Sequence, residues 1–239
     1  MPRPFLTARW ESLLLVNYAC PAELLEPLVP AGTKLDLWQD EALVSVVGFL
    51  FRDTRLRGVP VPFHRHFEEV NLRFYVRREV AGETRRAVAF VREIVPRQAI
   101  AAVARWRYNE PYVAAPMSHA VDLDPETGGT VEYRWRHEGE RFALTARAEG
   151  PAEMADPASE ASFITEHYYG YTAQRDGGTL EYRVEHPSWR LWTPTQAAFT
   201  GDASALYGPA LAAVVAGAPR SAMLAVGSEV AVYPGVRVA

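Results

Sequence analysis

An alternating run of polar and apolar residues over Phe67–Arg78 carries the side chains best suited to chemistry in this sequence. A β-strand places every second residue on one face. The polar members of this run are Glu69, Asn71, Arg73 and Tyr75. A carboxylate, an amide, a cation and a phenol on one face can bind an organic acid and move a proton. The period alone, however, favours a solvated outer face of a half-buried strand.

Two histidines shortly before this run raise the question of a metal site. His64 and His66 stand two residues apart, with Glu68 close behind, which is half of a ligand set. A third ligand at a recognisable spacing is absent, because the other histidines are scattered along the chain. The sequence therefore predicts no metal and no cofactor, and the two histidines are interpreted as loop residues.

Nucleophilic chemistry has few candidates. No Ser-His-Asp order, nucleophile elbow or glycine-rich phosphate loop occurs in the sequence. Cys20, the only cysteine, precedes a proline and is expected to be a small buried residue. Lys34 is the one lysine among 25 basic residues, and its place beside a turn predicts a solvated amine.

A group of aromatic residues follows later in the chain. Its members are His167, Tyr168, Tyr169 and Tyr171, with Trp189 and Trp192 beyond them. Such residues can line a pocket, but more often they form a core or a subunit interface. The sequence favours the core or interface and leaves open whether the protein forms homo-oligomers.

Short strands separated by turn signals dominate the predicted elements. Strands are expected at Glu11–Tyr18, Lys34–Trp38, Ala42–Thr54, Phe67–Arg78, Arg86–Val95, Met117–Leu123, Thr130–His137, Arg141–Ala148, Tyr169–Gln174, Thr179–His186 and Ala222–Tyr233. Helices are expected after Pro21, from Pro96 to about Arg107, around Ala158–His167 and near Ala203–Val215. This pattern predicts a mainly β (α+β) fold, with antiparallel strands in a barrel or a sandwich.

Composition limits the class of protein. A chain of 239 residues with a net charge of −4 suits one domain over residues 1–239 and shows no basic patch for nucleic acid. A single cysteine excludes an intrachain disulfide, and no apolar run approaches membrane-spanning length. Without the apolar core of a signal peptide in the first ten residues, we expect a cytoplasmic protein with no membrane partner.

Three segments carry a resemblance to a known family. They are Gly58–Pro62 followed by Phe67–Val76, then Phe163–Tyr171, and His186–Trp189. In this order they resemble the YqjF-like family, an uncharacterised group within the acetoacetate-decarboxylase-like superfamily. The resemblance covers nearly the whole chain and implies a closed or nearly closed antiparallel β barrel with a few flanking helices. Its lumen would hold a small ligand.

The more distant resemblance to acetoacetate decarboxylase bears on mechanism. That enzyme follows an Arg-Glu pair with a Pro-Lys-Lys sequence, and one of the lysines forms an imine with the substrate. The corresponding stretch here is Arg92–Gln98, in which Arg97 and Gln98 replace the lysines. Neither side chain forms an imine, so Schiff-base decarboxylation is not expected. One of the enzyme's active-site glutamates falls at Val47, and the other at Glu69.

A lumen changes the interpretation of the polar face. Glu69 becomes the candidate acid or base, although a one-residue slip would put Glu68 there instead. The predicted ligand-binding residues are Arg92, Arg97, Gln98, Asn71, Arg73, Tyr75 and His66. Three functions remain open: an enzyme using acid–base chemistry on a small organic acid or carbonyl compound, a binder without turnover, and a structural barrel without a ligand.

Overall fold

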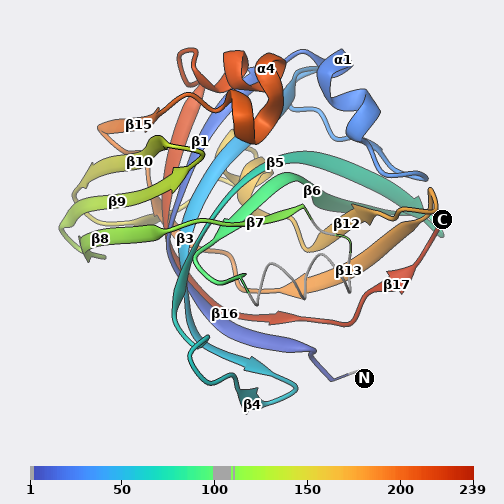
Figure 1. Ribbon diagram of the computed structural model, residues 1–239, viewed down its shortest axis with the longest axis horizontal. Helices are drawn as coiled ribbons and strands as arrows, with labels where there is room; N and C mark the ends of the chain where they lie inside the picture. Colours follow the sequence, from blue (N-terminus) through green and yellow to red (C-terminus); the bar gives the residue numbers. More distant parts are fainter. Residues whose placement is uncertain (1–2, 99–108, 110) are drawn as a thin grey trace.

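Seven strands of the main sheet form a ring in the computed structural model, which describes residues 3–98, 109 and 111–239 (Figure 1). In ring order they are β16 (Ser221–Val232), β1 (Leu6–Cys20), β3 (Ala42–Leu56), β5 (Phe67–Val80), β6 (Glu83–Val95), β12 (Tyr169–Ala173) and β13 (Thr179–Glu185). The pairs Val184–Val232 and Glu185–Ala231 join β13 to β16 and close the ring. The expected mainly β, nearly closed architecture is confirmed.

Six short strands extend this sheet. They are β2 (Lys34–Leu35), β4 (Val59–Pro60), β7 (Tyr112–Ala114), β11 (Glu153–Met154), β14 (Arg190–Trp192) and β17 (Val236–Arg237). All of these except β2 were missed, because two or three residues cannot establish a period. The expected strand at Lys34–Trp38 ends at Leu35. The strand pairs of the ring are antiparallel as expected except where β6 pairs in parallel with β12, and the short β7 also pairs in parallel with β6.

A second, four-stranded antiparallel sheet packs on the outside of the ring. Its order is β15 (Gln196–Thr200), β10 (Glu140–Glu149), β9 (Gly128–His137) and β8 (Met117–Asp124). Figure 1 shows this sheet beside the ring, with α4 (Ser204–Val215) and α1 (Ala22–Leu25) over one end of the ring. Gly48 on β3 permits this approach, because a side chain there would meet the Tyr133 ring at 2.7 Å.

The helices flank the ring and agree with most of the expected positions. They are α1 (Ala22–Leu25) with the 3-10 turn η1 (Glu26–Leu28), α3 (Glu160–Thr165) and α4 (Ser204–Val215). Gly208 breaks α4 with φ of 76°, directly before Pro209, whose ring cannot continue the helical hydrogen bonds. The helix expected from Pro96 to Arg107 falls largely outside the described residues.

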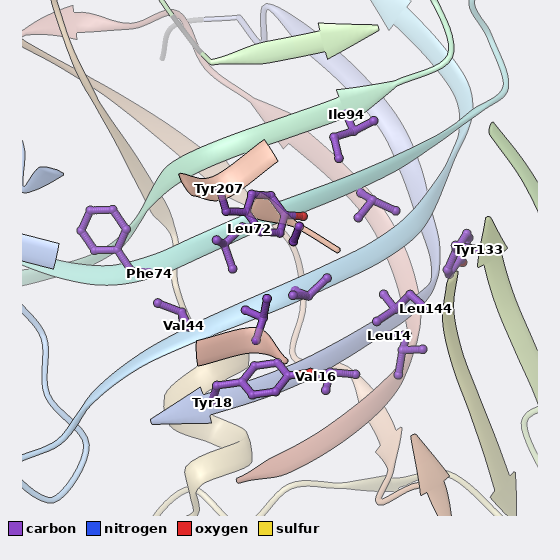
Figure 2. Close-up of a cluster of buried hydrophobic side chains, with 14 of the residues drawn as sticks. Leu14, Val16, Tyr18, Val44, Leu72, Phe74, Ile94, Tyr133, Leu144 and Tyr207 are labelled. Carbon is purple, nitrogen blue, oxygen red and sulfur yellow. The ribbon is translucent and has the colours of Figure 1, made fainter. Parts of the chain in front are cut away.

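Both faces of β5 are buried, which overturns the expectation of a solvated face. Val70, Leu72 and Phe74 belong to a core shared with the second sheet and α4, and Figure 2 shows Leu72 and Phe74 in this cluster. Glu69 and Asn71 point inward and are 3% and 2% exposed. The outer core thus holds the ring in shape while the inner face surrounds a lumen.

Candidate functional site

The lumen of the ring contains a cavity of about 350 Å³. Inward-facing residues of β1, β3, β5, β6 and β13 line it, together with β7 and the segment after α3. Most of the wall is apolar. The polar groups concentrate on β5 and its neighbours, where Glu69, Asn71, Arg73 and Glu93 all border the space. A mostly apolar cavity with a few convergent polar groups is the usual form of a small-molecule site.

Glu69 is the central ionisable group of this cavity. Asn71 Nδ2 donates a hydrogen bond to Glu69 Oε1 at 3.1 Å, and Tyr112 Oη donates to Oε2 at 3.2 Å. Burial raises the pKa of Glu69 to about 7, although both hydrogen bonds act to lower it. Near neutral pH the carboxyl group is therefore divided between acid and base forms, as general acid–base chemistry requires.

A second carboxylate lies close to the first. Glu93 on β6 pairs directly with Asn71 on β5 and with Tyr112 on β7. Directly opposed residues share a face of the sheet, so Asn71, Glu93 and Tyr112 form one polar level across three strands. Glu93 is 2% exposed and borders the cavity.

Replacing Asn71 by alanine is expected to raise the pKa of Glu69 further. The change removes a donor that favours the charged carboxylate, so the titration midpoint should move upward by about 0.5–1 pH unit. Carboxyl ¹³C NMR of the wild type and the variant measures this midpoint. Asn17→Ala is the control, because Asn17 is also a buried asparagine but bonds Ser45 and Ser221 instead. An unchanged or lower midpoint in Asn71→Ala would contradict the assigned hydrogen bond.

Arg73 brings a positive charge into the same lumen. Its Nη2 donates to the carbonyl oxygen of Ile164 at 3.3 Å, and its guanidinium carbon lies 5.6 Å from the centre of the Tyr75 ring. Among the described residues no acidic side chain forms an ion pair with Arg73, and its Nε has no hydrogen-bond partner. The guanidinium thus keeps unused donors at the cavity wall.

His167 borders the cavity beyond Arg73 but is held neutral. Burial lowers the pKa of His167 to about 4, although Asp36 Oδ2, which lies 3.7 Å from its Nε2, acts to raise it. Asp36 accepts a hydrogen bond from Arg86 Nε at 2.7 Å, so Arg86 is its charged partner at neutral pH. His167 can therefore offer a cavity ligand an uncharged ring.

The structure brings together only some of the predicted site residues. Glu69, Asn71 and Arg73 line the cavity, whereas Glu68 lies on the opposite face and contacts His119 Nδ1 at 2.7 Å. Tyr75 lies on the inner face but is fully buried, with its hydroxyl 2.5 Å from Ser45 Oγ.

The remaining predicted ligand residues lie elsewhere. Arg92 opposes Leu72 and therefore faces outward, where its Nε donates to the Leu206 carbonyl oxygen of α4 at 3.0 Å. Arg97 and Gln98 are exposed beyond the end of β6. His66 is also exposed, and its Nδ1 accepts from the backbone N–H of Asp53. None of the four is among the described residues that border the cavity.

Metal binding and membrane spanning find no support in the described residues. No group of three or more His, Cys, Asp or Glu side chains is arranged to hold a metal ion within the ranges 3–98, 109 and 111–239. In the same part of the chain, no helix is long and apolar enough to cross a bilayer.

Comparison with known proteins identifies the family to which the chain belongs. Residues 7–229 match DUF2071, a family described as uncharacterized conserved proteins. The chain belongs to this family. A relative, the uncharacterized protein YqjF of Bacillus subtilis, is 26% identical over 187 residues, which is 76% of this chain and 73% of YqjF. The expected membership of a YqjF-like group is confirmed.

Solved structures with the same fold are acetoacetate-decarboxylase-like enzymes. Acetoacetate decarboxylase from Legionella pneumophila superposes with a TM-score of 0.70 at 14% identity, covering 100% of the DUF2071 chain and 88% of its own. The enduracididine biosynthesis enzyme MppR, complexed with the condensation product of pyruvate and imidazole 4-carboxaldehyde, gives 0.65 at 11% identity, covering 99% and 90%. At these identities the likeness shows the fold alone.

The DUF2071 chain has no lysine in its lumen. Its sole lysine, Lys34, is exposed on β2 and does not border the cavity. Val47, where the decarboxylase resemblance expects a glutamate, faces Asn71 across the β3–β5 pair and adds an apolar surface. The carboxylates of the lumen are Glu69 and Glu93 among the described lining residues.

Several lining residues were missed or misjudged from sequence. Glu93 and Tyr112 were missed because their positions beside Asn71 follow from the pairing of β5, β6 and β7. The sequence alone does not reveal this pairing, since β7 is a short strand separated from β6 in the chain. The aromatic group was interpreted as core or interface, yet His167 and Tyr169 border the cavity, while Tyr171 is buried in the outer core. The alternation in Phe67–Arg78 grouped Glu69, Asn71 and Arg73 on one face, and the family resemblance was the signal that turned this face toward a lumen.

Proposed function

We propose that this DUF2071 protein binds a small organic acid or carbonyl compound in the lumen, with Arg73 as the anion anchor and Glu69 as the acid–base group. The observation that carries the proposal is the placement, on one wall of the same cavity, of a buried glutamate and an arginine that forms no ion pair with any described residue. A partly desolvated guanidinium is costly unless an anion complements it, and its planar fork suits a carboxylate.

The chemistry of Glu69 follows from its surroundings. Its base form can remove a proton from the carbon beside a carbonyl group, which leaves an enolate, and the resulting carboxylic acid can return that proton. The Asn71 and Tyr112 donors hold the carboxylate oriented during both steps. Such proton transfer needs no lysine. MppR, with the same fold, has been obtained in complex with pyruvate, which supports keto acids as the first compounds to test.

Binding without turnover is the second candidate. Val47 supports this candidate. It lies beside Asn71 on the neighbouring strand β3 and gives that part of the cavity wall no ionisable group for a second catalytic step. The two candidates share the ligand and the Arg73 anchor, and differ only in whether Glu69 exchanges protons with the bound compound.

A thermal-shift screen with pyruvate, acetoacetate and 3-hydroxybutyrate tests the shared anchor. At ten times the Kd, a ligand that binds only the folded protein adds about 1.4 kcal/mol to the free energy of unfolding. For a chain of this size that corresponds to a Tm increase of about 3–6 °C. Arg73→Met is expected to weaken binding about thirtyfold or more, since it removes one partner of a desolvated charge pair.

Arg77→Met is the matched control, because Arg77 lies on the same strand but is exposed outside the cavity. Arg97→Ala tests the anchor suggested by the decarboxylase resemblance, and we expect it to leave binding unchanged. Deuterium exchange at the carbon beside the carbonyl, followed by NMR, then separates turnover from binding. If the protein is an enzyme, the wild type accelerates this exchange and Glu69→Gln does not. If the protein only binds the compound, neither of them accelerates it. If the acids bind Arg73→Met as tightly as they bind the wild type, the proposal is wrong.

A further inference from the structure

The cavity extends well beyond its polar groups. The inward row of β5 runs Phe67, Glu69, Asn71 and Arg73, and six residues of extended strand span roughly 20 Å. This row therefore passes from an aromatic ring at one end to a cation at the other. A volume of about 350 Å³ lies in the range of pockets that enclose drug-sized molecules. A short keto acid at the polar end would leave the aromatic end empty.

The aromatic end is built on three adjacent strands at one level. Trp10 on β1 pairs with Phe51 on β3, which pairs with Phe67 on β5. Phe51 and Phe67 stack with centroids 4.6 Å apart and an interplanar angle of 14°, and Trp10 meets Phe51 edge-on at 5.9 Å. All three rings border the cavity.

Two more rings complete this wall. His186 stacks on Trp189 with centroids 4.1 Å apart and an angle of 15°. Trp189 Nε1 donates to Ser228 Oγ at 2.9 Å, and Ser228 is paired with Trp10 across β1 and β16. Trp189 is thus at the level of Trp10, with centroids 6.4 Å apart. We call Trp10, Phe51, Phe67, His186 and Trp189 the aromatic wall.

The aromatic wall differs from the aromatic packing of the outer core. There, Trp135, Phe142 and Phe199 stack against one another, and none of them borders the lumen cavity. The aromatic wall instead faces open space, so its rings forgo dispersion contacts that a flat ligand would restore. In addition, Trp10 Nε1 is buried and has no hydrogen-bond partner among the described residues.

We propose that the aromatic wall holds an aromatic ring, so that the ligands of this protein are aryl-substituted organic acids or carbonyl compounds. The inference rests on the proposed function, because it takes the acid group to lie toward Arg73 and the reacting carbon beside Glu69. Glu69 is one inward step from Phe67, roughly 7 Å along the strand, so a ring on the wall puts its substituent at Glu69. An arylpyruvate carries a ring, a carbonyl and a carboxylate in this order.

Calorimetric titration with phenylpyruvate, pyruvate and benzyl alcohol tests the ligand class. Phenylpyruvate is expected to bind at least about tenfold more tightly than pyruvate, because burial of the ring adds apolar contact. Trp189→Leu should weaken phenylpyruvate binding about three- to tenfold and change pyruvate binding less than about twofold. Trp192→Leu is the matched control, since Trp192 is equally buried but belongs to the outer core.

Indole N–H resonances of the unaltered protein provide a second measurement that does not depend on a variant that folds. Phenylpyruvate should shift the Trp10 and Trp189 signals and leave Trp135 unmoved, whereas pyruvate should shift none of them. This pattern supports the inference.

Failure of the inference and failure of the proposed function give different results. Equal binding of pyruvate and phenylpyruvate, both weakened in Arg73→Met, would overturn the aryl class and leave the proposed function standing. Benzyl alcohol binding as tightly as phenylpyruvate, with Arg73→Met harmless, would overturn the acid anchor and keep the aromatic subsite. No binding by any of the three compounds would overturn both.

Discussion

Replacement of Glu69 by glutamine is expected to raise the free energy of unfolding at pH 8 by about 3 kcal/mol. In the wild type, burial raises the pKa of Glu69 from 4.5 to about 7. Above pH 7 the folded protein must therefore hold a desolvated carboxylate that is better solvated in the unfolded chain. Glutamine is uncharged at every pH and keeps the oxygen that accepts from Asn71 Nδ2.

The sign of the pH dependence follows from the raised pKa. Between about pH 4.5 and 7 the folded protein binds more protons at Glu69 than the unfolded chain does, so stability falls as pH rises through this window. Below pH 4.5 both states are protonated, and above pH 7 both are ionised. The difference between Glu69→Gln and wild type should thus be small at pH 4.5, grow to pH 7 and then stay constant.

Urea unfolding at pH 4.5, 6 and 8 measures this difference. Glu68→Gln is the matched control, because the neighbouring glutamate faces the other side of β5, beside His119. Comparison with wild type at each pH removes the effects of other groups, including His167, whose lowered pKa destabilises the fold toward acid. A gain in Glu69→Gln that is the same at all three pH values would contradict the raised pKa.

Replacement of Leu72 by alanine is expected to cost about 2–5 kcal/mol of stability while leaving ligand binding intact. Leu72 is 0% exposed and lies in the outer core, where it packs in the cluster drawn in Figure 2. Its truncation leaves a cavity between the ring and the elements that cover it, but it does not reach the lumen. Urea unfolding gives the stability loss, and titration with a bound acid gives the Kd.

The result separates the two faces of β5. A loss below about 1 kcal/mol would mean that this face is not a packed core. A Kd raised as strongly as in Arg73→Met would mean that Leu72 shapes the ligand site, contrary to its outward direction. Val80, partly buried at the end of the same strand, is the control position, and Val80→Ala should cost much less.

The local pattern predicted much of the secondary structure because each long strand carries its own period. The alternation in Phe67–Arg78 indicated β5 and sorted its residues correctly into two faces. The Asp176-Gly177-Gly178 turn indicated the β12–β13 hairpin, and the pattern near Ala203–Val215 indicated α4. Family membership was also readable, because short motifs in a given order are a property of the sequence alone.

The assignment of faces was not readable from the strand itself. Periodicity placed Glu69 and Leu72 on different faces of the strand but could not say which face meets solvent. In the structure both residues are buried. That answer depends on the second sheet and α4, which cover the outer face from segments that begin at Met117, well beyond the end of β5 at Val80. The same reason explains Arg92. The decarboxylase resemblance suggested a lumen position for Arg92, but pairing with Leu72 turns this residue toward α4.

The amino-acid sequence by itself determined which groups this protein has for chemistry: carboxylates, arginines, aromatic rings and a single lysine that lies outside the stretch Arg92–Gln98. Tertiary structure decided which of them meet. Closure of the ring through β13 and β16 brought Trp10, Glu69 and Arg73 around one cavity and excluded the solvent that would keep the pKa of Glu69 ordinary. Burial and proximity are properties of the assembled ring, because each depends on residues distant in sequence.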